Sequence, residues 1–391
     1  MQGSGRKNFL RKKKLTKEKK YMNQQRHKRV IISGGGTGGH IFPAISIANA
    51  LRKIDPDVQI LFVGAEGRME MEKVPAAGYR IVGLPVAGID RKNLLKNFSV
   101  LLKLFKSLRL ARKTIVEFRP DVAVGVGGYA SGPVLKQSLK MGIPVLIQEQ
   151  NSYAGVTNKI LAGRASVICV AYDGMEKYFP SEKIIKTGNP VRQSYDNLEA
   201  LKGDALKFFG LNADLPVILV LGGSLGAGSV NKCLSRNIQT LYNSPCQWLW
   251  QTGKQYFDEI SQMVPDSFRS RISVHPFIDR MELAFAAADI IISRAGAGTI
   301  SELCLVGKPV ILIPSPNVAE DHQTKNALAL VSRNAAVMIP DNMVESSLIN
   351  EATNLVKDGP GRKMLADNIS KMAERDADMR IAREVLKLTE K

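Results

Sequence analysis

The segment Arg29–Leu51 reads RVIISGGGTGGHIFPAISIANAL. Its apolar, β-branched beginning predicts a strand over Val30–Ser33, and the spacing of apolar residues after the glycines predicts a helix over Phe42–Ile54. Five glycines and Thr37 lie in between. Glycines let the backbone of such a loop approach a ligand closely, and the N–H groups at the start of a helix can bind an anion. The segment therefore predicts a phosphate-binding loop in an α/β fold.

Short apolar segments of the same kind recur along the chain, and each is predicted to be a strand. Those in the first half are Val58–Val63, Val122–Val126, Pro144–Gln148, Val167–Val170 and Lys183–Thr187. The pattern breaks at the turn sequence TGNPVR, Thr187–Arg192, and begins again at PVILVL, Pro216–Leu221. Such short runs are typical of parallel strands that are buried on both faces. The sequence thus predicts an α/β protein with two doubly wound, Rossmann-like domains that face each other across a cleft.

The break in the pattern also sets the predicted domain boundaries. Residues 29–189 are expected to form the N-terminal domain and residues 190–371 the C-terminal domain. The segment Gly361–Leu388 has continuous helical spacing. We expect its last part, about residues 372–391, to pack back on the N-terminal domain as a closing helix.

The composition excludes several classes of protein. With 391 residues, 45% of them hydrophobic, the chain can form two cores. Its four cysteines form no C-x-x-C pair and no two of its four histidines are spaced as metal ligands, so we expect no metal, no disulfide framework and a reducing compartment. The longest apolar runs are strand-sized and the N-terminus lacks the apolar core of a signal peptide. This pattern predicts a protein of the cytosol or of the inner face of a membrane.

The positive charge of the chain is concentrated at its N-terminus. Residues 1–29 hold twelve Lys and Arg against one Glu, which is +11 of the total formal charge of +19. We expect residues 1–28 to be a disordered basic extension, which either binds nucleic acid or anionic lipid or has no role. The alternative that the extension has no role stays open, because Met22 could be the first residue of the protein.

The histidine that ends the first glycine loop is a candidate general base. His40 is expected near the start of a helix, where the positive end of the helix dipole opposes protonation of the imidazole. A neutral imidazole can accept a proton from a substrate. Alternatively, His40 only caps the helix or holds the loop by a hydrogen bond.

Three more segments carry candidate contacts. A second glycine loop, Gly222–Asn231, follows a predicted strand, and its Ser224 can donate to a phosphate. A third, Ser293–Glu302, again joins strand to helix; Glu302 either complements the helix dipole or accepts the hydroxyls of a ribose. The polar segment Glu320–Ala327 either lines the cleft or is an ordinary loop. The two Asp-x-Asp matches, at Asp55 and Asp376, read as accidental, so a leaving phosphate would be stabilised by helix ends.

The segment Asn93–Lys113 has the pattern of a basic amphipathic helix. Its apolar face includes Leu94, Phe98, Leu101 and Phe105, and the lysines on the other side include Lys96, Lys103 and Lys106. Further leucines widen the apolar part beyond what one packed face needs. This pattern predicts contact with a membrane surface; the alternative is a helix packed on its sheet with a solvated basic face.

Taken together in this order and spacing, these motifs resemble the MurG family of peptidoglycan N-acetylglucosaminyltransferases, over nearly the whole chain from about Arg29. The motifs are GGGTGGHIFPA, GVGGYASGP, IQEQNSYAGVTNK, TGNPVR, GGSLGA, RAGAGTISE and DHQTKNA. The resemblance implies the two-domain GT-B fold. It implies an inverting transfer of GlcNAc from UDP-GlcNAc to the C4 hydroxyl of MurNAc in lipid I (undecaprenyl-pyrophosphoryl-MurNAc-pentapeptide), which makes lipid II for peptidoglycan synthesis.

The resemblance also implies where the protein works. The family is peripheral on the cytoplasmic face of the cell membrane, so an anionic membrane surface is an expected partner, with other proteins of cell-wall synthesis and cell division as further partners. No cofactor is expected, and nucleic acid is not an expected partner of the folded domains.

Roles for individual residues follow from the same resemblance. His40 matches the proposed base, and Glu149 is the alternative if His40 proves dispensable. The residues that match UDP-GlcNAc contacts are Thr37, Gly38, Gly39, Asn151, Arg192, Ser224, Ile278, Ala297, Gly298, Thr299, Ile300, Ser301, Glu302 and Gln323. In the family pattern, the backbone of Ile278 contacts the uracil, Glu302 contacts the ribose and Gln323 contacts the GlcNAc hydroxyls.

Two positions depart from the family pattern, and two other functions compete. Leu225 stands where many members have Gln, and His322 stands where some have Gln. Another GT-B enzyme, such as a diacylglycerol glycosyltransferase or a UDP-GlcNAc 2-epimerase, would share much of the pattern. A non-catalytic nucleic-acid-binding protein is suggested by the basic extension alone.

Overall fold

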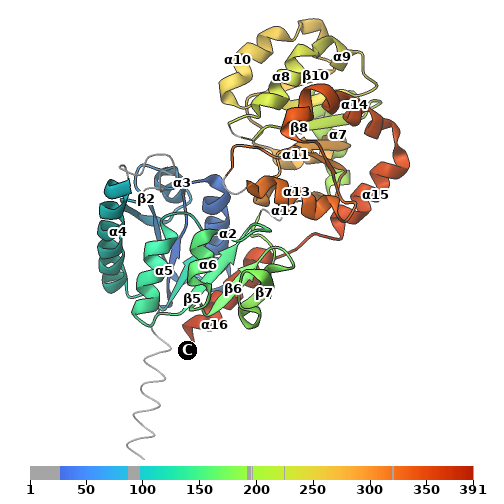
Figure 1. Ribbon diagram of the computed structural model, residues 1–391. Coiled ribbons are helices and arrows are strands. Elements are labelled where there is room, and N and C mark those ends of the chain that lie inside the picture. The colour runs from blue at the N-terminus through green and yellow to red at the C-terminus, as the bar shows by residue number, and fades with distance from the viewer. Residues whose placement is uncertain are drawn as a thin grey trace, which may run out of the picture.

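Two parallel β-sheets with helices packed on them form the two halves of the computed structural model (Figure 1). The structure describes residues 27–86, 97–191, 195, 197–223, 225–318 and 321–390. Strand and helix alternate along both halves, because each short apolar run forms a strand and each longer amphipathic segment returns the chain along the sheet. The predicted α/β architecture of two doubly wound domains is confirmed.

The N-terminal sheet has the strand order β3-β2-β1-β4-β5-β6-β7, and its neighbouring strands pair in parallel. Its strands are β1 (Arg29–Ser33), β2 (Gln59–Ala65), β3 (Arg80–Leu84), β4 (Val122–Gly125), β5 (Val145–Glu149), β6 (Val167–Val170) and β7 (Ile184–Lys186). The helices are α2 (Gly38–Ile54), α3 (Glu70–Ala76), α4 (Asn97–Phe118), α5 (Ser131–Lys140) and α6 (Val156–Ala162). The direction of winding reverses between β1 and β4, and ligands of open α/β sheets bind at the strand ends beside such a switch point.

The C-terminal sheet repeats this plan with the order β10-β9-β8-β11-β12-β13, again in parallel. Its strands are β8 (Val217–Leu221), β9 (Gln247–Gln251), β10 (Ile272–His275), β11 (Ile290–Ser293), β12 (Val310–Leu312) and β13 (Val337–Met338). The helices are α7 (Leu198–Phe209), α8 (Gly228–Arg236), α9 (Ile238–Tyr242), α10 (Lys254–Met263), α11 (Met281–Ala287), α12 (Ala297–Val306), α13 (His322–Val331), α14 (Val344–Lys357) and α15 (Gly359–Ser370). The switch point of this sheet lies between β8 and β11.

Successive side chains of the central strands enter different hydrophobic cores. In β1, Val30 and Ile32 belong to one cluster and Ile31 to another. In β8, Ile218 and Leu219 likewise belong to two different clusters. Both faces of each sheet are therefore covered, which explains why these strands consist of uninterrupted apolar residues rather than alternating ones.

The last helix returns to the N-terminal domain. Helix α16 (Ala377–Thr389) packs against α2, and its Ile381 and Val385 are fully buried in the core around β1. The prediction that Gly361–Leu388 is helical throughout is wrong. Helix α15 ends at Ser370 and α16 begins at Ala377, because the segment between them crosses from one domain to the other (Figure 1). Asp376, which precedes α16, has a left-handed backbone with φ of 54°.

Two element boundaries and one strand also differ from the prediction. Helix α2 begins at Gly38 rather than Phe42, so His40 lies in its first turn. Strand β3 was not predicted, because Gly83 interrupts its short apolar run. Helix α4 extends to Phe118, beyond the predicted end at Lys113.

Candidate functional site

The glycine loops all lie at the switch points of the two sheets. The first loop joins β1 to α2, the second joins β8 to α8, and the third joins β11 to α12. Helices α2 and α12 belong to different domains and are in contact. The N-terminal ends of helices carry unpaired N–H groups and partial positive charge, so this arrangement is suited to an anion such as a diphosphate.

A buried carboxylate fixes the first loop. Glu70, at the start of α3, has no exposed surface. Its carboxylate accepts hydrogen bonds from the Gly36 N–H, at 3.1 Å to each oxygen, and from the Ala65 N–H at 2.9 Å. A Cβ atom at Gly35 would lie only 2.1 Å from this carboxylate. Glu70 was not a predicted site residue, because its local sequence reads as the first turn of an ordinary helix.

His40 is held between the first loop and the loop after β4. Its Nδ1 lies 3.1 Å from the Thr37 hydroxyl, and a Cβ atom at Gly127 would lie 2.7 Å from its Cδ2. Burial lowers the pKa of His40 below its ordinary value of 6.5; Glu149, a hydrogen bond with the Gly35 backbone and Glu70 oppose this shift, while His322 adds to it. The imidazole is therefore neutral at pH 7 and can accept a proton.

Only glycine fits where the loop after β4 meets the first loop. Gly128 has a φ of +85°, and a Cβ atom there would lie 2.2 Å from the Gly35 carbonyl oxygen. The motif GVGGYASGP thus allows two loops at the switch point to pack backbone against backbone.

Glu149 organises the segment after β5. One of its carboxylate oxygens accepts from the N–H of Asn151 at 3.1 Å and from the side-chain amide of Asn151 at 3.3 Å. The other accepts from the Gly155 N–H at 3.0 Å and from the Asn158 amide at 2.9 Å. The side chain is 2% exposed. Because each oxygen already accepts two hydrogen bonds, the Glu149 carboxylate is engaged in holding the segment 151–158.

Two asparagines connect the domains beside this loop. Asn326 of α13 accepts from the N–H and the hydroxyl of Ser152, at 3.1 and 3.0 Å, and its amide lies 3.3 Å from the Asn151 side-chain oxygen. Asn189 donates to the Gln150 carbonyl at 3.0 Å and to the Ser301 hydroxyl at 2.9 Å. Neither Asn189 nor Asn326 was a predicted site residue, although both lie in motifs that were singled out.

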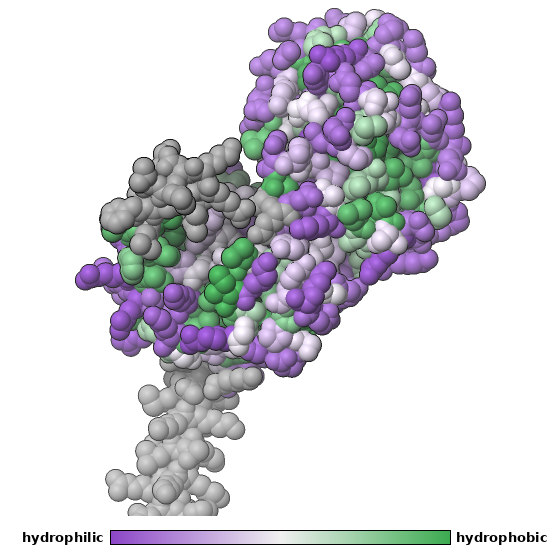
Figure 2. Space-filling model, viewed as in Figure 1, coloured by the Kyte–Doolittle hydropathy of each residue, from purple (hydrophilic) through white to green (hydrophobic). Residues whose placement is uncertain are grey.

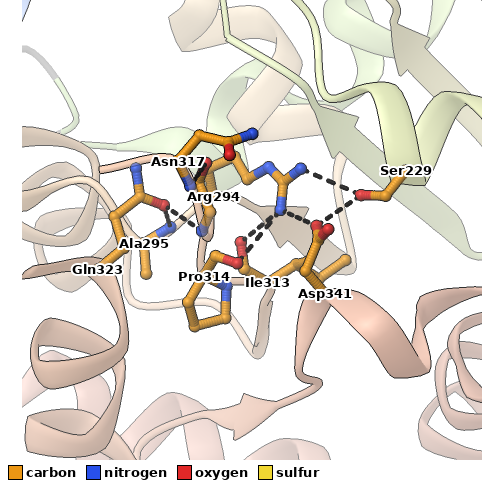
Figure 3. Close-up of polar contacts among 9 residues, drawn as sticks. Ser229, Arg294, Ala295, Ile313, Pro314, Asn317, Gln323 and Asp341 are labelled. Carbon is orange, nitrogen blue, oxygen red and sulfur yellow. Dashed lines mark hydrogen bonds and ion pairs between the residues drawn. The ribbon is translucent and has the colours of Figure 1, made fainter. Parts of the chain in front are cut away.

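The third loop is held by Gln323, which lies in the first turn of α13. Its side-chain oxygen accepts from the Ala295 N–H at 3.2 Å and from the Ser315 N–H at 2.9 Å (Figure 3). In α12 the side chain of Ile300 is buried in the C-terminal core, whereas Glu302 accepts a hydrogen bond from the Tyr195 hydroxyl at 3.2 Å. Gly298 and Thr299 lie in the first turn of this helix, where N–H groups have no partner within the helix.

The second loop is connected to the segment of Ile278. Gln251, at the end of β9, donates to the Gly223 carbonyl at 3.2 Å and accepts from the Ile278 N–H at 3.0 Å. Leu225 is 76% exposed at the tip of the loop. Two predicted contacts, Arg192 and Ser224, lie outside the described residues.

A cavity of about 680 Å³ lies between the domains, beside the two chain crossings. Its lining includes Asn189 and Ser152 from the N-terminal side and Ser301 and Leu328 from the C-terminal side. Among the residues that the structure describes, no three His, Cys, Asp or Glu side chains are grouped so that they could hold a metal ion.

Helix α4 presents apolar and basic side chains to solvent. Phe105 is 64% exposed and Leu102 is 56% exposed, and Lys103 and Lys106 are also exposed. The buried face of the helix is instead formed by Ser107, Ala111 and Ile115, and it packs against α5. Figure 2 shows hydrophobic surface at this edge of the N-terminal domain, next to strongly hydrophilic residues.

Part of the predicted membrane contact cannot be placed. Leu94 and Lys96 lie outside the described residues, as do the side chains of Phe98 and Leu101. In the part of the chain with described structure, no helix has the length and apolar character needed to cross a membrane.

Two family models match the chain. The glycosyltransferase family 28 N-terminal domain matches residues 30–170, and the glycosyltransferase family 28 C-terminal domain matches residues 217–381. A relative from Parabacteroides distasonis is 58% identical over 363 residues, which cover 93% of this chain and 99% of the relative. That relative is named UDP-N-acetylglucosamine--N-acetylmuramyl-(pentapeptide) pyrophosphoryl-undecaprenol N-acetylglucosamine transferase.

Solved structures agree with the fold. The crystal structure of MurG from Acinetobacter baumannii is similar with a TM-score of 0.76 and 28% identity, and the match covers 92% of this chain and 99% of that one. The UDP-GlcNAc 2-epimerase from Neisseria meningitidis, bound to UDP-GlcNAc, has a TM-score of 0.62 and covers 92% of this chain and 100% of its own. At 14% identity this second likeness shows the fold alone.

The role of Glu70 in holding the first loop is testable by its removal. Glu70→Ala leaves the buried N–H group of Ala65 and the more exposed N–H group of Gly36 without their acceptor, so we expect a loss of about 1–3 kcal/mol of unfolding free energy, mostly from Ala65. Urea denaturation, followed by circular dichroism, measures this loss. Glu72→Ala is the matched control, because Glu72 lies on the same helix with 77% of its side chain exposed, and its effect should stay within about 0.5 kcal/mol. Equal midpoints for the two variants would contradict the assignment.

Proposed function

The chain belongs to glycosyltransferase family 28, and from this membership we propose that it is an N-acetylglucosaminyltransferase of peptidoglycan synthesis. It transfers GlcNAc from UDP-GlcNAc to undecaprenyl-pyrophosphoryl-MurNAc-pentapeptide, lipid I, and the product is lipid II. The observation that carries the chemistry is the position of His40. A neutral imidazole lies in the first turn of α2, and α2 is in contact with the α12 helix of the opposite domain.

The donor is proposed to bind across the starts of α12 and α2. Glu302 would accept hydroxyls of the ribose, and the backbone of Ile278 would contact the uracil. The remaining proposed donor contacts are Thr37, Gly38, Gly39, Asn151, Arg192, Ser224, Ala297, Gly298, Thr299, Ile300, Ser301 and Gln323. Since the Ile300 side chain is buried and its N–H is bonded within the helix, Ile300 would act by shaping the first turn of α12. The N–H groups at the helix starts stabilise the negative diphosphate.

In the proposed reaction His40 removes the proton from the acceptor C4 hydroxyl. The oxygen attacks the anomeric carbon of GlcNAc, a C–O bond forms, and the bond to the UDP oxygen breaks with inversion. The negative charge that develops on the leaving diphosphate lies next to helix N-termini, which are oriented before the reaction and need no reorganisation. The proton stays on His40 until it is lost to solvent.

The acceptor is a membrane lipid, so we propose that the protein works at the cytoplasmic face of the cell membrane. The exposed apolar and basic residues of α4, Phe105, Lys103 and Lys106 among them, support this location. Contacts with other proteins of cell-wall synthesis and division would follow from the same place.

A transfer assay tests the proposed reaction. Purified protein, lipid I in detergent and labelled UDP-GlcNAc should give labelled lipid II. Two parallel reactions test the competing enzymes: one offers diacylglycerol as acceptor, and one contains UDP-GlcNAc alone and is analysed for the epimerised sugar nucleotide. Label that appears only in a glycolipid from diacylglycerol, or only in the epimer, would disprove the proposal.

The base is tested with His40→Ala. Turnover should fall by about 10²–10⁴-fold, the range typical of general-base removal, while the Kd for UDP-GlcNAc from calorimetry stays close to that of the wild type. The variant removes the proton acceptor but leaves the N–H groups of the helix start in place. A fully active variant would move the base role to Glu149 or to solvent.

The pH profile of the wild type provides a second measurement of the same assignment. The base must be neutral to act, so kcat/KM should fall on the acid side, as pH decreases through the pKa of His40. Since this pKa is lowered, the fall should be centred below pH 6.5. A limb centred above pH 6.5, or one that persists in His40→Ala, would exclude His40 as its source.

Binding to vesicles tests the role of α4. Neutralising Lys103 and Lys106 to Gln should weaken binding to vesicles that contain phosphatidylglycerol by about 30-fold, since each lysine near an anionic surface contributes about 1 kcal/mol. Sedimentation with vesicles at low and high salt measures this. The charge-matched control neutralises Lys254 and Lys363, which are exposed on the C-terminal domain. Equal binding by both double variants would rule out α4 as the membrane contact.

A further inference from the structure

A polar bridge lies behind the loops that we propose to hold the donor (Figure 3). Its centre is Arg294, which directly follows β11 and is separated from the start of α12 by two residues. One guanidinium nitrogen donates to the carbonyl oxygens of Ile313 and Pro314, at 3.2 and 3.3 Å, and forms an ion pair with Asp341. The other nitrogen donates to the Ser229 hydroxyl at 3.1 Å. Arg294 thereby joins the ends of two strands to a third segment of the chain.

Asp341 connects this arginine to the start of a second helix. It opens the short helix Asp341–Met343 after β13, and its carboxylate also accepts from the Ser229 hydroxyl at 2.6 Å. Ser229 is the second residue of α8 and lies near the end of the second glycine loop, Gly222–Asn231. A single carboxylate oxygen of Asp341 therefore accepts from Arg294, near the start of the third loop, and from Ser229, near the end of the second loop.

The bridge is partly shielded from solvent, which distinguishes it from the exposed surface pairs. The Arg294 and Asp341 side chains are 19% and 23% exposed. Exposed pairs contribute little to stability, but a charge-assisted pair with reduced solvent contact holds its partners in a defined geometry. Removing the charge of Asp341 would leave a half-buried guanidinium without its counter-ion.

The two segments that the bridge joins must keep a fixed separation. Helices α8 and α12 start next to the two glycine loops of the C-terminal domain, and both loops carry proposed donor contacts, Ser224 in the second and Ala297–Thr299 in the third. Glycine loops do not fix their own conformation, because the glycine backbone can adopt many combinations of φ and ψ. A contact with a residue from another segment is needed to set their distance, and Asp341 supplies it by joining Arg294, directly after β11, to Ser229 in the first turn of α8.

We propose that Asp341 is a positioning residue for donor binding, which acts through Arg294 and Ser229 to set the relative position of the starts of α8 and α12. Asp341 belongs to none of the glycine loops and reaches the donor site only through these two side chains. The inference rests on the proposed function, since it presumes a nucleotide diphosphate at these helix starts.

The test is Asp341→Asn, which keeps the shape of the side chain and removes its charge. We expect the KM for UDP-GlcNAc and the calorimetric Kd for UDP each to rise about tenfold, the effect of losing one charge-assisted hydrogen bond at a positioned site. The KM for lipid I should stay within about twofold, because the proposed membrane contact on α4 puts the lipid acceptor on the N-terminal domain. A purely structural residue would lower the melting temperature without this selective effect on the donor.

A second pair of variants keeps the test decisive if Asp341→Asn does not fold. Ser229→Ala removes the hydroxyl that joins α8 to the bridge, whereas Ser229→Thr retains it. Donor affinity should fall in the first and be restored in the second. The matched control is Glu345→Gln, which breaks the exposed pair of Arg236 and Glu345 between α8 and α14 and should leave donor affinity unchanged.

The outcomes separate the inference from the proposed function. If the wild type binds UDP and makes lipid II but the Asp341 and Ser229 variants bind UDP with unchanged affinity, the positioning role is wrong and the function stands. If the wild type itself binds neither UDP nor UDP-GlcNAc, the proposed function fails, and the inference fails with it.

Discussion

A parallel sheet that is covered on both faces forces the chain to leave each strand at the same edge. All contacts that build this site follow from that constraint. In each domain the winding reverses once, at β1 and β4 and at β8 and β11, and the loops there can separate to admit a ligand. Since a helix follows each of these strands, helix starts with unpaired N–H groups collect at the switch points, and the contact between α2 and α12 brings the two sets together.

Loops that are rich in glycine need acceptors from outside to hold them. Three segments here receive an acceptor from a side chain outside the loop, whereas the second loop receives a donor, the Gln251 amide. Glu70 accepts from the first loop, Glu149 from the segment after β5, Gln323 from the third loop, and Gln251 contacts the second. The glycines permit close backbone packing, as Gly128 against Gly35 requires, and the buried carboxylates and amides then remove the freedom that glycine brings.

The sequence indicates local features well and distant partners poorly. The strand, the glycine loop and His40 are adjacent in the chain, so their relation could be predicted from Arg29–Leu51 alone. Glu70 and Asp341 could not be found in this way, because their partners are 34 and 47 residues distant and neither lies in a recognisable pattern. The break between α15 and α16 was missed for the same reason, since helical spacing continues through a segment whose path is set by the need to cross between domains.

The contacts between the domains bear on how a lipid-linked acceptor can enter. At Asn189 and Asn326 the domains are joined by hydrogen bonds between uncharged groups, each of which contributes about 1 kcal/mol net. These bonds are weak beside the apolar cores on each sheet, so a motion of the domains as intact units would break them, and the exposed Asp173–Arg333 ion pair, before it disturbed either core. Asn326 bonds to the loop that Glu149 organises, while Asn189 bonds to α12. The same two asparagines therefore hold the segment after β5, on the N-terminal side, against α12 and α13, on the C-terminal side, which is where the proposed reaction requires His40 and the donor to meet.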